Sequence, residues 1–128
     1  MSRTLSILGS TGSIGEATLR AARFLKDEVR VYGLACGGNL RLLEEQIREF
    51  RPEAVAVASR AAAASGEYRD LGRKFPDVVF LEGDDGVAEL AGRRVDILVS
   101  AIVGAAGLKP TLASIGAARR LALANKET

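Results

Sequence analysis

Apolar and polar positions alternate along the chain in two different rhythms. Short apolar runs rich in β-branched residues predict strands at residues 5–8, 29–35, 54–58, 78–81, 95–100 and 121–124. Between them, apolar residues recur every three or four positions and predict helices over residues 14–25, 40–50, 61–75 and 86–91, with a last helix beginning near residue 110. Such an alternation predicts a parallel sheet with right-handed crossovers. The predicted fold class is therefore an α/β, Rossmann-like doubly wound parallel sheet in three layers, αβα.

Polar residues at the predicted helix ends support these boundaries. Asn39 stands where an N-cap is expected before the helix of residues 40–50, and Pro52 follows just after that helix. Ser13 and Glu16 have the spacing of a capping box, which predicts Ser13 as the N-cap of the first helix. Both helices are thus expected to begin directly after a strand and its loop.

The loop after the first predicted strand is rich in glycine. Gly9, Gly12 and Gly15 follow the spacing G-x-x-G-x-x-G, whereas the usual dinucleotide fingerprint, G-x-G-x-x-G, would need glycine in place of Ser10. The physical roles are still provided: a tight turn, close approach of the backbone to a pyrophosphate, and close packing of the helix on the strand. The alternative is a glycine-rich turn that binds nothing, but the strand–loop–helix context favours a nucleotide cofactor.

Hydrogen-bond donors gather on the same loop. Thr11 and Ser13 add hydroxyl groups to the backbone amides of Gly12 and Ile14. The helix that follows offers unpaired N–H groups and the positive end of its dipole. These four residues are therefore the predicted pyrophosphate-binding group.

The end of the second predicted strand bears on the choice between NAD and NADP. An NAD site would place Asp or Glu there to bind the ribose 2′-hydroxyl, and this segment has no acidic residue. Gly37 and Gly38 leave room for a bulky group, Asn39 lies at a helix start that favours an anion, and Arg41 is near enough to add positive charge. By itself the segment also fits a simple glycine turn with an Asn cap. Together with the first loop, it favours NADP.

Two further segments follow predicted strands at the edge where ligands bind in open α/β sheets. Residues 100–110 are mostly small and permit either close approach of the far half of a dinucleotide or a tightly packed turn. Three polar residues, Asn125, Lys126 and Glu127, follow the last predicted strand. They form either the edge of an active site or a solvated terminus. The residues alone leave both pairs of alternatives open.

Composition excludes several classes of function. The chain has 128 residues, which fits one domain, a net charge of +2 and no histidine. A His-ligated metal site or His-based triad is thus impossible within it, and without a basic stripe no nucleic-acid partner is expected. The single cysteine, Cys36, is predicted to serve packing. The apolar runs are too short for a membrane span or signal peptide, so we expect no membrane partner and a cytoplasmic location.

The chain resembles the 1-deoxy-D-xylulose 5-phosphate reductoisomerase family. The resemblance covers the whole chain and lies in GSTGSIG at residues 9–15, Gly38-Asn39, SAIVGAAGL at residues 100–108 with Pro110-Thr111, and LANKE at residues 123–127. The strings AIVGAAGL and ANKE are far more specific than the glycine loop. The resemblance implies an enzyme that uses NADPH and a divalent metal, Mg or Mn, to convert 1-deoxy-D-xylulose 5-phosphate to 2-C-methyl-D-erythritol 4-phosphate in non-mevalonate isoprenoid biosynthesis.

The resemblance also implies a role for each motif. One set of residues would bind NADPH: Thr11, Gly12, Ser13 and Ile14 at its pyrophosphate, Gly37, Gly38 and Asn39 at its adenosine 2′-phosphate end, and Asn125 and Glu127 elsewhere on the cofactor. Lys126 would contact the substrate, a small phosphorylated sugar. Family members often carry a basic residue where this chain has Gly38, and Arg41 is the candidate to compensate.

The family's metal-binding carboxylates, substrate-phosphate ligands and flexible lid lie downstream of the Asn-Lys-Glu motif. We therefore expect residues 1–128 to be an NADP-binding Rossmann domain, the N-terminal fragment of a longer enzyme whose catalytic and C-terminal domains are absent. The fragment is expected to hold no catalytic residue and no metal ligand, to bind NADPH and to be inactive alone. A homodimer is expected only for the full-length enzyme. The alternatives are the cofactor domain of another NADP-dependent dehydrogenase, of the aspartate-semialdehyde or homoserine type, and a non-catalytic nucleotide-sensing module.

Overall fold

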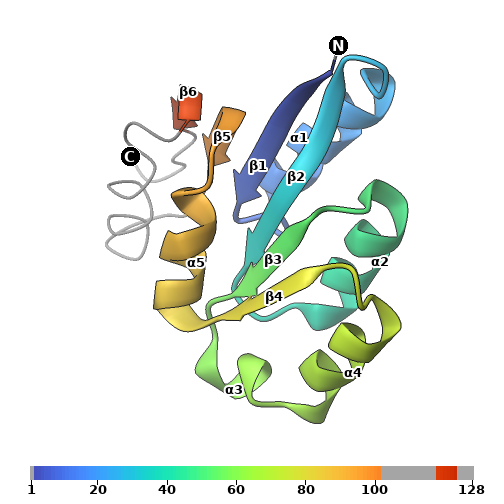
Figure 1. Cartoon of the computed structure of the whole chain (residues 1–128), viewed down its shortest axis with the longest axis vertical. Coiled ribbons are helices and arrows are strands. Elements are labelled where there is room, and N and C mark those ends of the chain that lie inside the picture. Colours follow the sequence, from blue (N-terminus) through green and yellow to red (C-terminus); the bar gives the residue numbers. More distant parts are fainter. Residues whose placement is uncertain (1, 102–117, 124–128) are drawn as a thin grey trace.

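The computed structural model describes residues 2–101 and the backbone of residues 118–123, and these residues form one parallel sheet with helices packed on it (Figure 1). The strands are β1 (Arg3–Leu8), β2 (Val29–Cys36), β3 (Ala54–Val57), β4 (Val79–Glu82), β5 (Val95–Ser100) and β6 (Ala118–Leu123). The helices are α1 (Ser13–Phe24), α2 (Leu40–Phe50), α3 (Arg60–Ala63), α4 (Gly66–Lys74) and α5 (Gly83–Ala91). The predicted alternation of strands and helices is confirmed.

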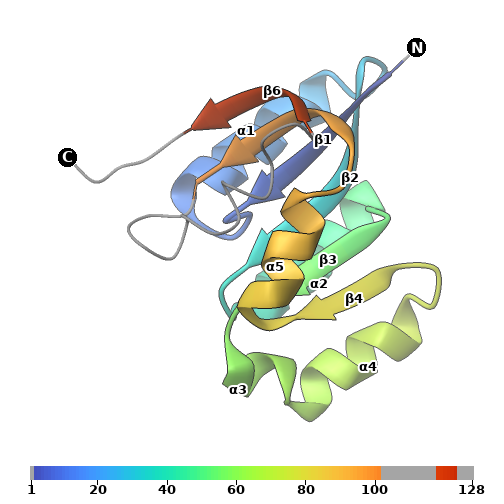
Figure 2. The same ribbon diagram turned by 60° about the vertical axis from the view of Figure 1, so that its left-hand side comes forward.

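The six strands lie in the order β4-β3-β2-β1-β5-β6, and every pair of neighbours is parallel. The chain runs outward from β1 to β4, and then α5 returns it to the opposite side of β1 (Figure 2). The order of strands thus reverses at β1, where Leu8 pairs with Ala35 of β2 and with Ser100 of β5. In sheets of this kind the crevice for a ligand opens beyond the carboxyl ends of the strands at such a reversal.

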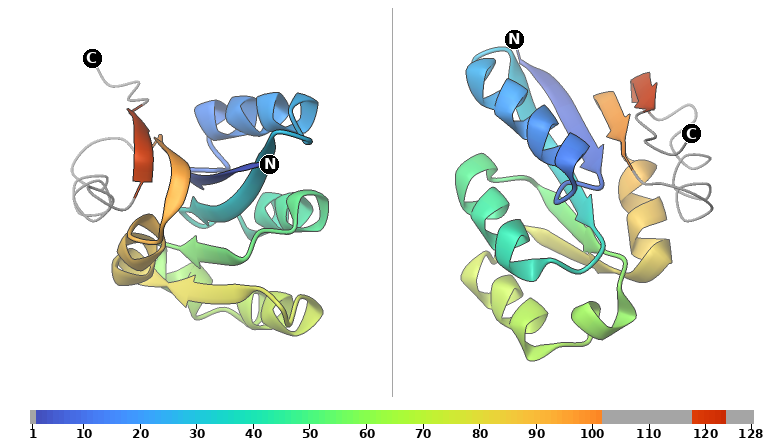
Figure 3. Two further views of the ribbon diagram at one scale, coloured as in Figure 1. Left: turned by 45° about the horizontal axis from the view of Figure 1, so that its top comes forward. Right: turned by 180° about the vertical axis from the view of Figure 1, so that it is seen from behind.

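Helices cover both faces of the sheet and enclose two apolar clusters. On one face α1, α2 and α4 pack through buried residues such as Leu19, Leu43, Ile47 and Leu71. On the other face α5 packs its Val87, Leu90 and Ala91 against the sheet, and the three layers are visible in both views of Figure 3. The predicted three-layer, doubly wound architecture is therefore confirmed, with strands buried on both sides as parallel sheets require.

Most predicted boundaries agree with the structure to within three residues, and the largest difference lies in residues 61–75. The pattern there predicts one helix, whereas the chain forms α3 and α4 in succession. Ser65 caps the second of these, since its side chain accepts a hydrogen bond from the backbone N–H of Tyr68 at 3.2 Å, and Gly66 begins that helix. A residue that favours an N-cap and a glycine together end one helix and begin another.

The capping box predicted at the first helix is wrong. The N-cap is Gly12, which has no side chain to cap the helix, and Ser13 is the first helical residue. The prediction that Asn39 is the N-cap of α2 is confirmed, because the Asn39 side chain accepts a hydrogen bond from Leu42 N–H at 3.1 Å. The helix expected near Pro110 lies outside the described residues. Within the described part of the chain, no helix combines the length and apolarity that a membrane span needs.

Candidate dinucleotide-binding site

The glycine loop begins with a turn that only glycine fits. Gly9 has φ +89°, and a Cβ there would lie 3.1 Å from the carbonyl oxygen of Ala101. The backbone N–H groups of Gly9 and Ser10 both donate to the carbonyl of Ala35, at 2.7 and 2.8 Å. Ala101 N–H in turn donates to the carbonyl of Leu8 at 2.8 Å. The exits of the three central strands are therefore joined at the point where the strand order reverses.

Gly15 allows α1 to begin directly on top of this turn. A Cβ on Gly15 would lie 2.1 Å from the Gly9 carbonyl oxygen and 2.7 Å from two backbone atoms of Ser10. No side chain fits such a gap, so the closeness of α1 to the end of β1 depends on glycine at this position. The predicted role of the third glycine, close packing of helix on strand, is confirmed.

Gly12, the N-cap of α1, places no side chain over the start of this helix. Its N–H donates to the Gly9 carbonyl at 3.2 Å, its φ is −81°, and a Cβ there would meet only the Gly9 carbonyl oxygen, at 3.6 Å. Neither the backbone conformation nor a neighbour among the described residues requires glycine at position 12, so the small residue leaves space on the outer side of the loop. The first N–H groups of a helix have no partner within it, and an anion is stabilised there by the dipole. Gly12 and Ser13 are exposed, and Thr11 and Ile14 are partly exposed.

The turn after β2 lies against the start of the loop after β3. Ala58 N–H donates to the Cys36 carbonyl at 2.9 Å, and Ser59 N–H donates to the Gly37 carbonyl at 2.7 Å. Among the described residues, a Cβ on Gly37 would meet nothing within 4 Å, whereas one on Gly38 would lie 3.3 Å from the Cβ of Ser59. Position 37 therefore opens onto free space, and position 38 lacks room for a side chain unless Ser59 moves.

Asn39 and Arg41 lie at the start of α2, Asn39 as its N-cap and Arg41 as its second residue. Asn39 is exposed and caps the helix, so one of the orphan N–H groups is already satisfied by its side chain. Arg41 is exposed in the first turn and also borders a groove of about 290 Å³ between α2 and α4, together with Glu44 and Lys74. Arg41 is thus close in sequence to the turn after β2 but also flanks a groove that contains acidic groups.

Cys36 has a packing role, as predicted. Its side chain is buried within the core of the α1, α2 and α4 face, and burial raises the pKa of the thiol to about 11. The backbone N–H of Asn39 acts in the opposite direction on this pKa, and burial is the larger effect. The thiol is therefore protonated at neutral pH, and a buried, protonated thiol is a poor nucleophile.

Sequence reasoning missed Gln46 of α2. This residue is only 5% exposed, and its Nε2 donates to the carbonyl of Ser10 in the glycine loop at 2.9 Å. The signal was present in the sequence, since Gln46 is a polar residue directly beside the apolar stripe of Leu43 and Ile47. A buried polar side chain in an amphipathic helix generally marks a specific hydrogen bond.

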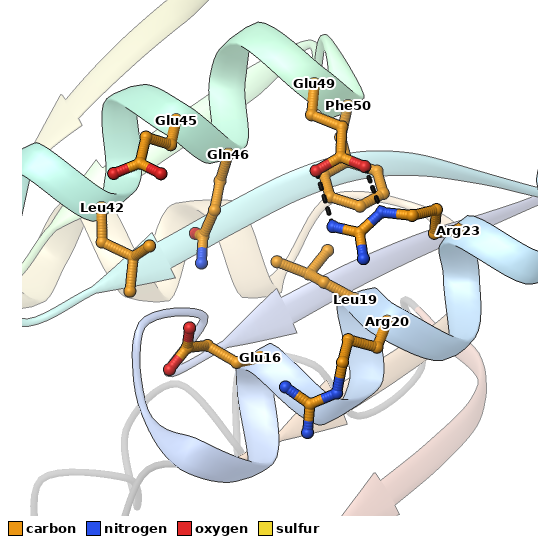
Figure 4. A pocket seen from close by; sticks show the side chains of 9 residues that line it. All are labelled: Glu16, Leu19, Arg20, Arg23, Leu42, Glu45, Gln46, Glu49 and Phe50. Carbon is orange, nitrogen blue, oxygen red and sulfur yellow. Dashed lines mark hydrogen bonds and ion pairs between the residues drawn. The ribbon is translucent and has the colours of Figure 1, made fainter.

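A groove of about 270 Å³ runs between α1 and α2, and Figure 4 shows the side chains that line it. Arg23 forms an ion pair with Glu49 across the groove and lies over the ring of Phe50, with its guanidinium carbon 5.8 Å from the ring centroid. Glu16 and Gln46 line the other end of the groove. The groove runs along the flanks of the helices, and its charged groups are already paired or solvated.

The first two predicted motifs follow neighbouring strands: Thr11–Ile14 come after β1, and Gly37–Asn39 come after β2. The two strand exits are joined where Gly9 and Ser10 N–H donate to the Ala35 carbonyl. Because β6 is parallel to β5 with Leu123 opposite Ser100, the chain leaves β6 at this same edge of the sheet. Asn125, Lys126 and Glu127 themselves lie outside the described residues, as do residues 102–110. Among the residues that are described, no cluster of carboxylate or thiol groups could hold a metal ion.

Comparison with known proteins identifies relatives of the whole chain. A family model described as 1-deoxy-D-xylulose 5-phosphate reductoisomerase matches residues 5–128. The 1-deoxy-D-xylulose 5-phosphate reductoisomerase of Chlorobium chlorochromatii (strain CaD3) is 50% identical over 127 residues, which cover 98% of this chain and 32% of that protein. The protein of the same name from Nostoc sp. (strain PCC 7120) is 43% identical over 131 residues, covering 100% of this chain and 32% of its own.

Solved structures agree with this assignment. The 1-deoxy-D-xylulose 5-phosphate reductoisomerase from Zymomonas mobilis in complex with NADPH superposes with a TM-score of 0.87 at 33% identity, over 99% of this chain and 33% of that chain. A DOX-P reductoisomerase in complex with magnesium gives a TM-score of 0.84 at 38% identity, over 99% of this chain and 32% of that chain. The chain thus spans about a third of the length of the relatives that it matches. It belongs to the 1-deoxy-D-xylulose 5-phosphate reductoisomerase family.

Proposed function

We propose that this chain binds NADPH at the carboxyl edge of its sheet and serves as the cofactor-binding part of a 1-deoxy-D-xylulose 5-phosphate reductoisomerase. The observation that carries the proposal is the start of α1, where the N-cap is glycine and, among the described residues, only the Gly9 carbonyl oxygen lies within 4 Å of the place that a Cβ would take. A pyrophosphate fits such a surface, since it needs close approach of the backbone and is stabilised by the positive end of the helix dipole. Family membership and the NADPH complex of the Zymomonas mobilis relative support the same ligand.

Residue roles follow from this placement. Thr11, Gly12, Ser13 and Ile14 bind the pyrophosphate through backbone amides and hydroxyl groups. The open space at Gly37, with Gly38 and Asn39 beside it, receives the adenosine end and its 2′-phosphate, with Arg41 as the nearest cation on α2.

The exit of β6 would complete the site. Asn125 and Glu127 contact the cofactor and Lys126 contacts the phosphorylated sugar, and these assignments rest on the resemblance in the LANKE motif.

NADPH supplies a hydride when it is bound, and the protein contributes binding and orientation. The glycine loop holds the pyrophosphate at the reversal of strand order, which directs the nicotinamide half toward the exits of β5 and β6. The described residues offer no metal-ligand cluster, so we assign the divalent metal of the reaction to the remaining two-thirds of the enzyme. A homodimer is proposed for the full-length enzyme alone, and the free thiol of Cys36 suits a reducing, cytoplasmic location.

Calorimetric titration of the 128-residue chain with NADPH and with NADH tests this proposal. We expect NADPH to bind at least about tenfold more tightly than NADH, a difference of about 1.4 kcal/mol, because no carboxylate at the end of β2 repels the 2′-phosphate. Equal affinity for both would refute the NADP assignment. Failure to bind either cofactor would refute the proposed binding role of the chain.

A further inference from the structure

The geometry points to Gln46 as a positioning residue that sets the orientation of the pyrophosphate loop from α2; the inference rests on the proposed function. Gln46 comes from a different element than the loop, and the Ser10 carbonyl it binds is 36 residues away in sequence. Figure 4 shows its side chain projecting from α2 into the space between α2 and α1. The contact therefore joins the helix of one predicted motif to the loop of the other.

Ser10 is held from both sides. Its N–H donates to the Ala35 carbonyl of β2 at 2.8 Å, and its carbonyl accepts from Gln46 Nε2 at 2.9 Å. Ser10 itself is fully buried, and its backbone packs against Gly15 so closely that a Cβ there would lie 2.7 Å away. These contacts fix the orientation of the peptide unit between Ser10 and Thr11.

That peptide unit also contains the N–H of Thr11. In a planar trans peptide the carbonyl and the N–H point in opposite directions, and the described chain has no cis bond. Because Gln46 draws the Ser10 carbonyl toward α2, the Thr11 N–H points away from α2. Among the described residues nothing accepts a hydrogen bond from this N–H, and Thr11 is partly exposed. Gln46 thus fixes the direction of a backbone donor that the pyrophosphate would use.

The chemistry of the contact favours positioning over simple packing. The Oε1 atom of Gln46 is buried and has no hydrogen-bond partner among the described residues, so the amide is an unfavourable group for filling core space. Leucine or methionine would fill the same position in the apolar stripe without that penalty. What only the amide provides is a donor for the Ser10 carbonyl.

Gln46 also lies seven residues, two helical turns, after Asn39 and therefore on the same side of α2. The helix that starts at the adenosine end of the site is thus anchored, through Gln46, to the loop at its pyrophosphate end. Loss of the amide should loosen the loop and leave the adenosine end intact.

Gln46→Met removes the donor and keeps an apolar side chain of similar length. Calorimetry and NMR titration of the 128-residue chain compare two ligands, NADPH and adenosine 2′-monophosphate, which lacks the pyrophosphate. We expect the variant to bind NADPH about tenfold more weakly and adenosine 2′-monophosphate within about twofold of wild type. Urea unfolding of each variant confirms that the folded state is the one compared.

Tyr68→Phe is the matched control. The hydroxyl of Tyr68 is also a side-chain donor to a backbone carbonyl, that of Leu81 at 2.6 Å, and the residue is 3% exposed. Its loss removes the same kind of hydrogen bond far from the glycine loop. Affinity for both ligands should remain at the wild-type value in this variant.

The amide resonance of Thr11 gives a second measurement that does not depend on any variant. In the wild-type chain it should shift on titration with NADPH and stay unchanged with adenosine 2′-monophosphate. The inference is overturned if the Thr11 amide resonance does not shift on addition of NADPH. It is also overturned if the Gln46→Met variant binds NADPH as tightly as wild type, or if its affinity for both ligands falls equally. If wild type binds no NADPH, the proposed function itself fails, a result distinct from these.

Discussion

At the scale of single residues, the glycines of the candidate site divide into two kinds. Gly9 and Gly15 are required by the protein itself, one by its positive φ and the other by the backbone atoms that crowd it. Gly12 and Gly37 are not required by any neighbour in the described part of the chain, and we propose that the cofactor binds at the surface that they leave open. The same residue type therefore serves folding at some positions and binding at others.

Gly15→Ala should destabilise the fold. The new Cβ would lie 2.1 Å from the Gly9 carbonyl oxygen, so α1 must move away from β1, and we expect a loss of about 3 kcal/mol in the free energy of unfolding. Gly37→Ala is the control, because its Cβ would meet nothing within 4 Å and should change stability by less than about 0.5 kcal/mol. Urea denaturation measures both. Equal midpoints for the two variants would contradict the packing described here.

The buried thiol of Cys36 should make stability depend on alkaline pH. Its pKa is raised from 9.0 to about 11 because burial disfavours the thiolate. Between these values the unfolded chain has lost the proton and the folded chain has kept it, so stability is full below pH 9 and falls as pH rises toward 11. The expected slope from this group is about 1.4 kcal/mol per pH unit.

Denaturant unfolding across that pH range, compared between wild type and Cys36→Ala, isolates the contribution of the thiol. The variant should lack this part of the slope, whereas other alkaline groups such as Tyr68 remain in both proteins. Parallel pH profiles for the two proteins would show that the thiol titrates normally.

At the scale of elements, α2 connects the two ends of the candidate site. Its first residues face the turn after β2, and Gln46 reaches the glycine loop. The apolar stripe and the Asn39 cap correctly predicted the first and last residues of this helix, because the pattern is local and strong. The contact of Gln46 with Ser10 could not be predicted in the same way, since it depends on how two distant elements pack.

Asn39→Asp should separate helix capping from cofactor choice. Aspartate caps a helix as well as asparagine does and favours the dipole, so stability should stay within about 0.5 kcal/mol of wild type. The added negative charge beside the proposed 2′-phosphate position should reduce the preference for NADPH over NADH by about tenfold or more. Calorimetry with the two cofactors measures this ratio.

Ser65→Asp makes the same kind of change at the N-cap of α4, away from the candidate site. It should leave the preference for NADPH unchanged, which controls for a general effect of charge. A fall in preference as large as that of Asn39→Asp would argue against 2′-phosphate binding at the start of α2.

At the scale of the whole molecule, the chain is one sheet with its candidate site on one edge, and it covers about a third of the length of its relatives. The sheet positions the glycine loop after β1 and the turn after β2, where we propose that the pyrophosphate and the adenosine end bind. The described residues supply no cluster for a metal. Under the proposed function, this chain binds the cofactor, and the metal chemistry belongs to the rest of the enzyme.

The 128-residue chain should therefore bind NADPH without oxidising it. With 1-deoxy-D-xylulose 5-phosphate and Mg²⁺ or Mn²⁺ present, we expect no consumption of NADPH above the rate without protein, because the groups that would activate the substrate are not among the residues described. Absorbance of the reduced nicotinamide follows the reaction, and a full-length relative serves as positive control. Sustained turnover by this chain would overturn the proposed division of labour.

Residue order by itself determined the alternation of strands and helices, the cap at Asn39, the glycine loop and the family, because each of these is written in local pattern or in specific strings. Tertiary structure alone decided that Gly12 and not Ser13 is the N-cap of α1, that residues 61–75 form two helices, and that Gln46 binds the loop. Each of these depends on the space and the hydrogen-bond partners that distant segments offer. Local preference cannot specify a contact between elements until the sheet has brought them together.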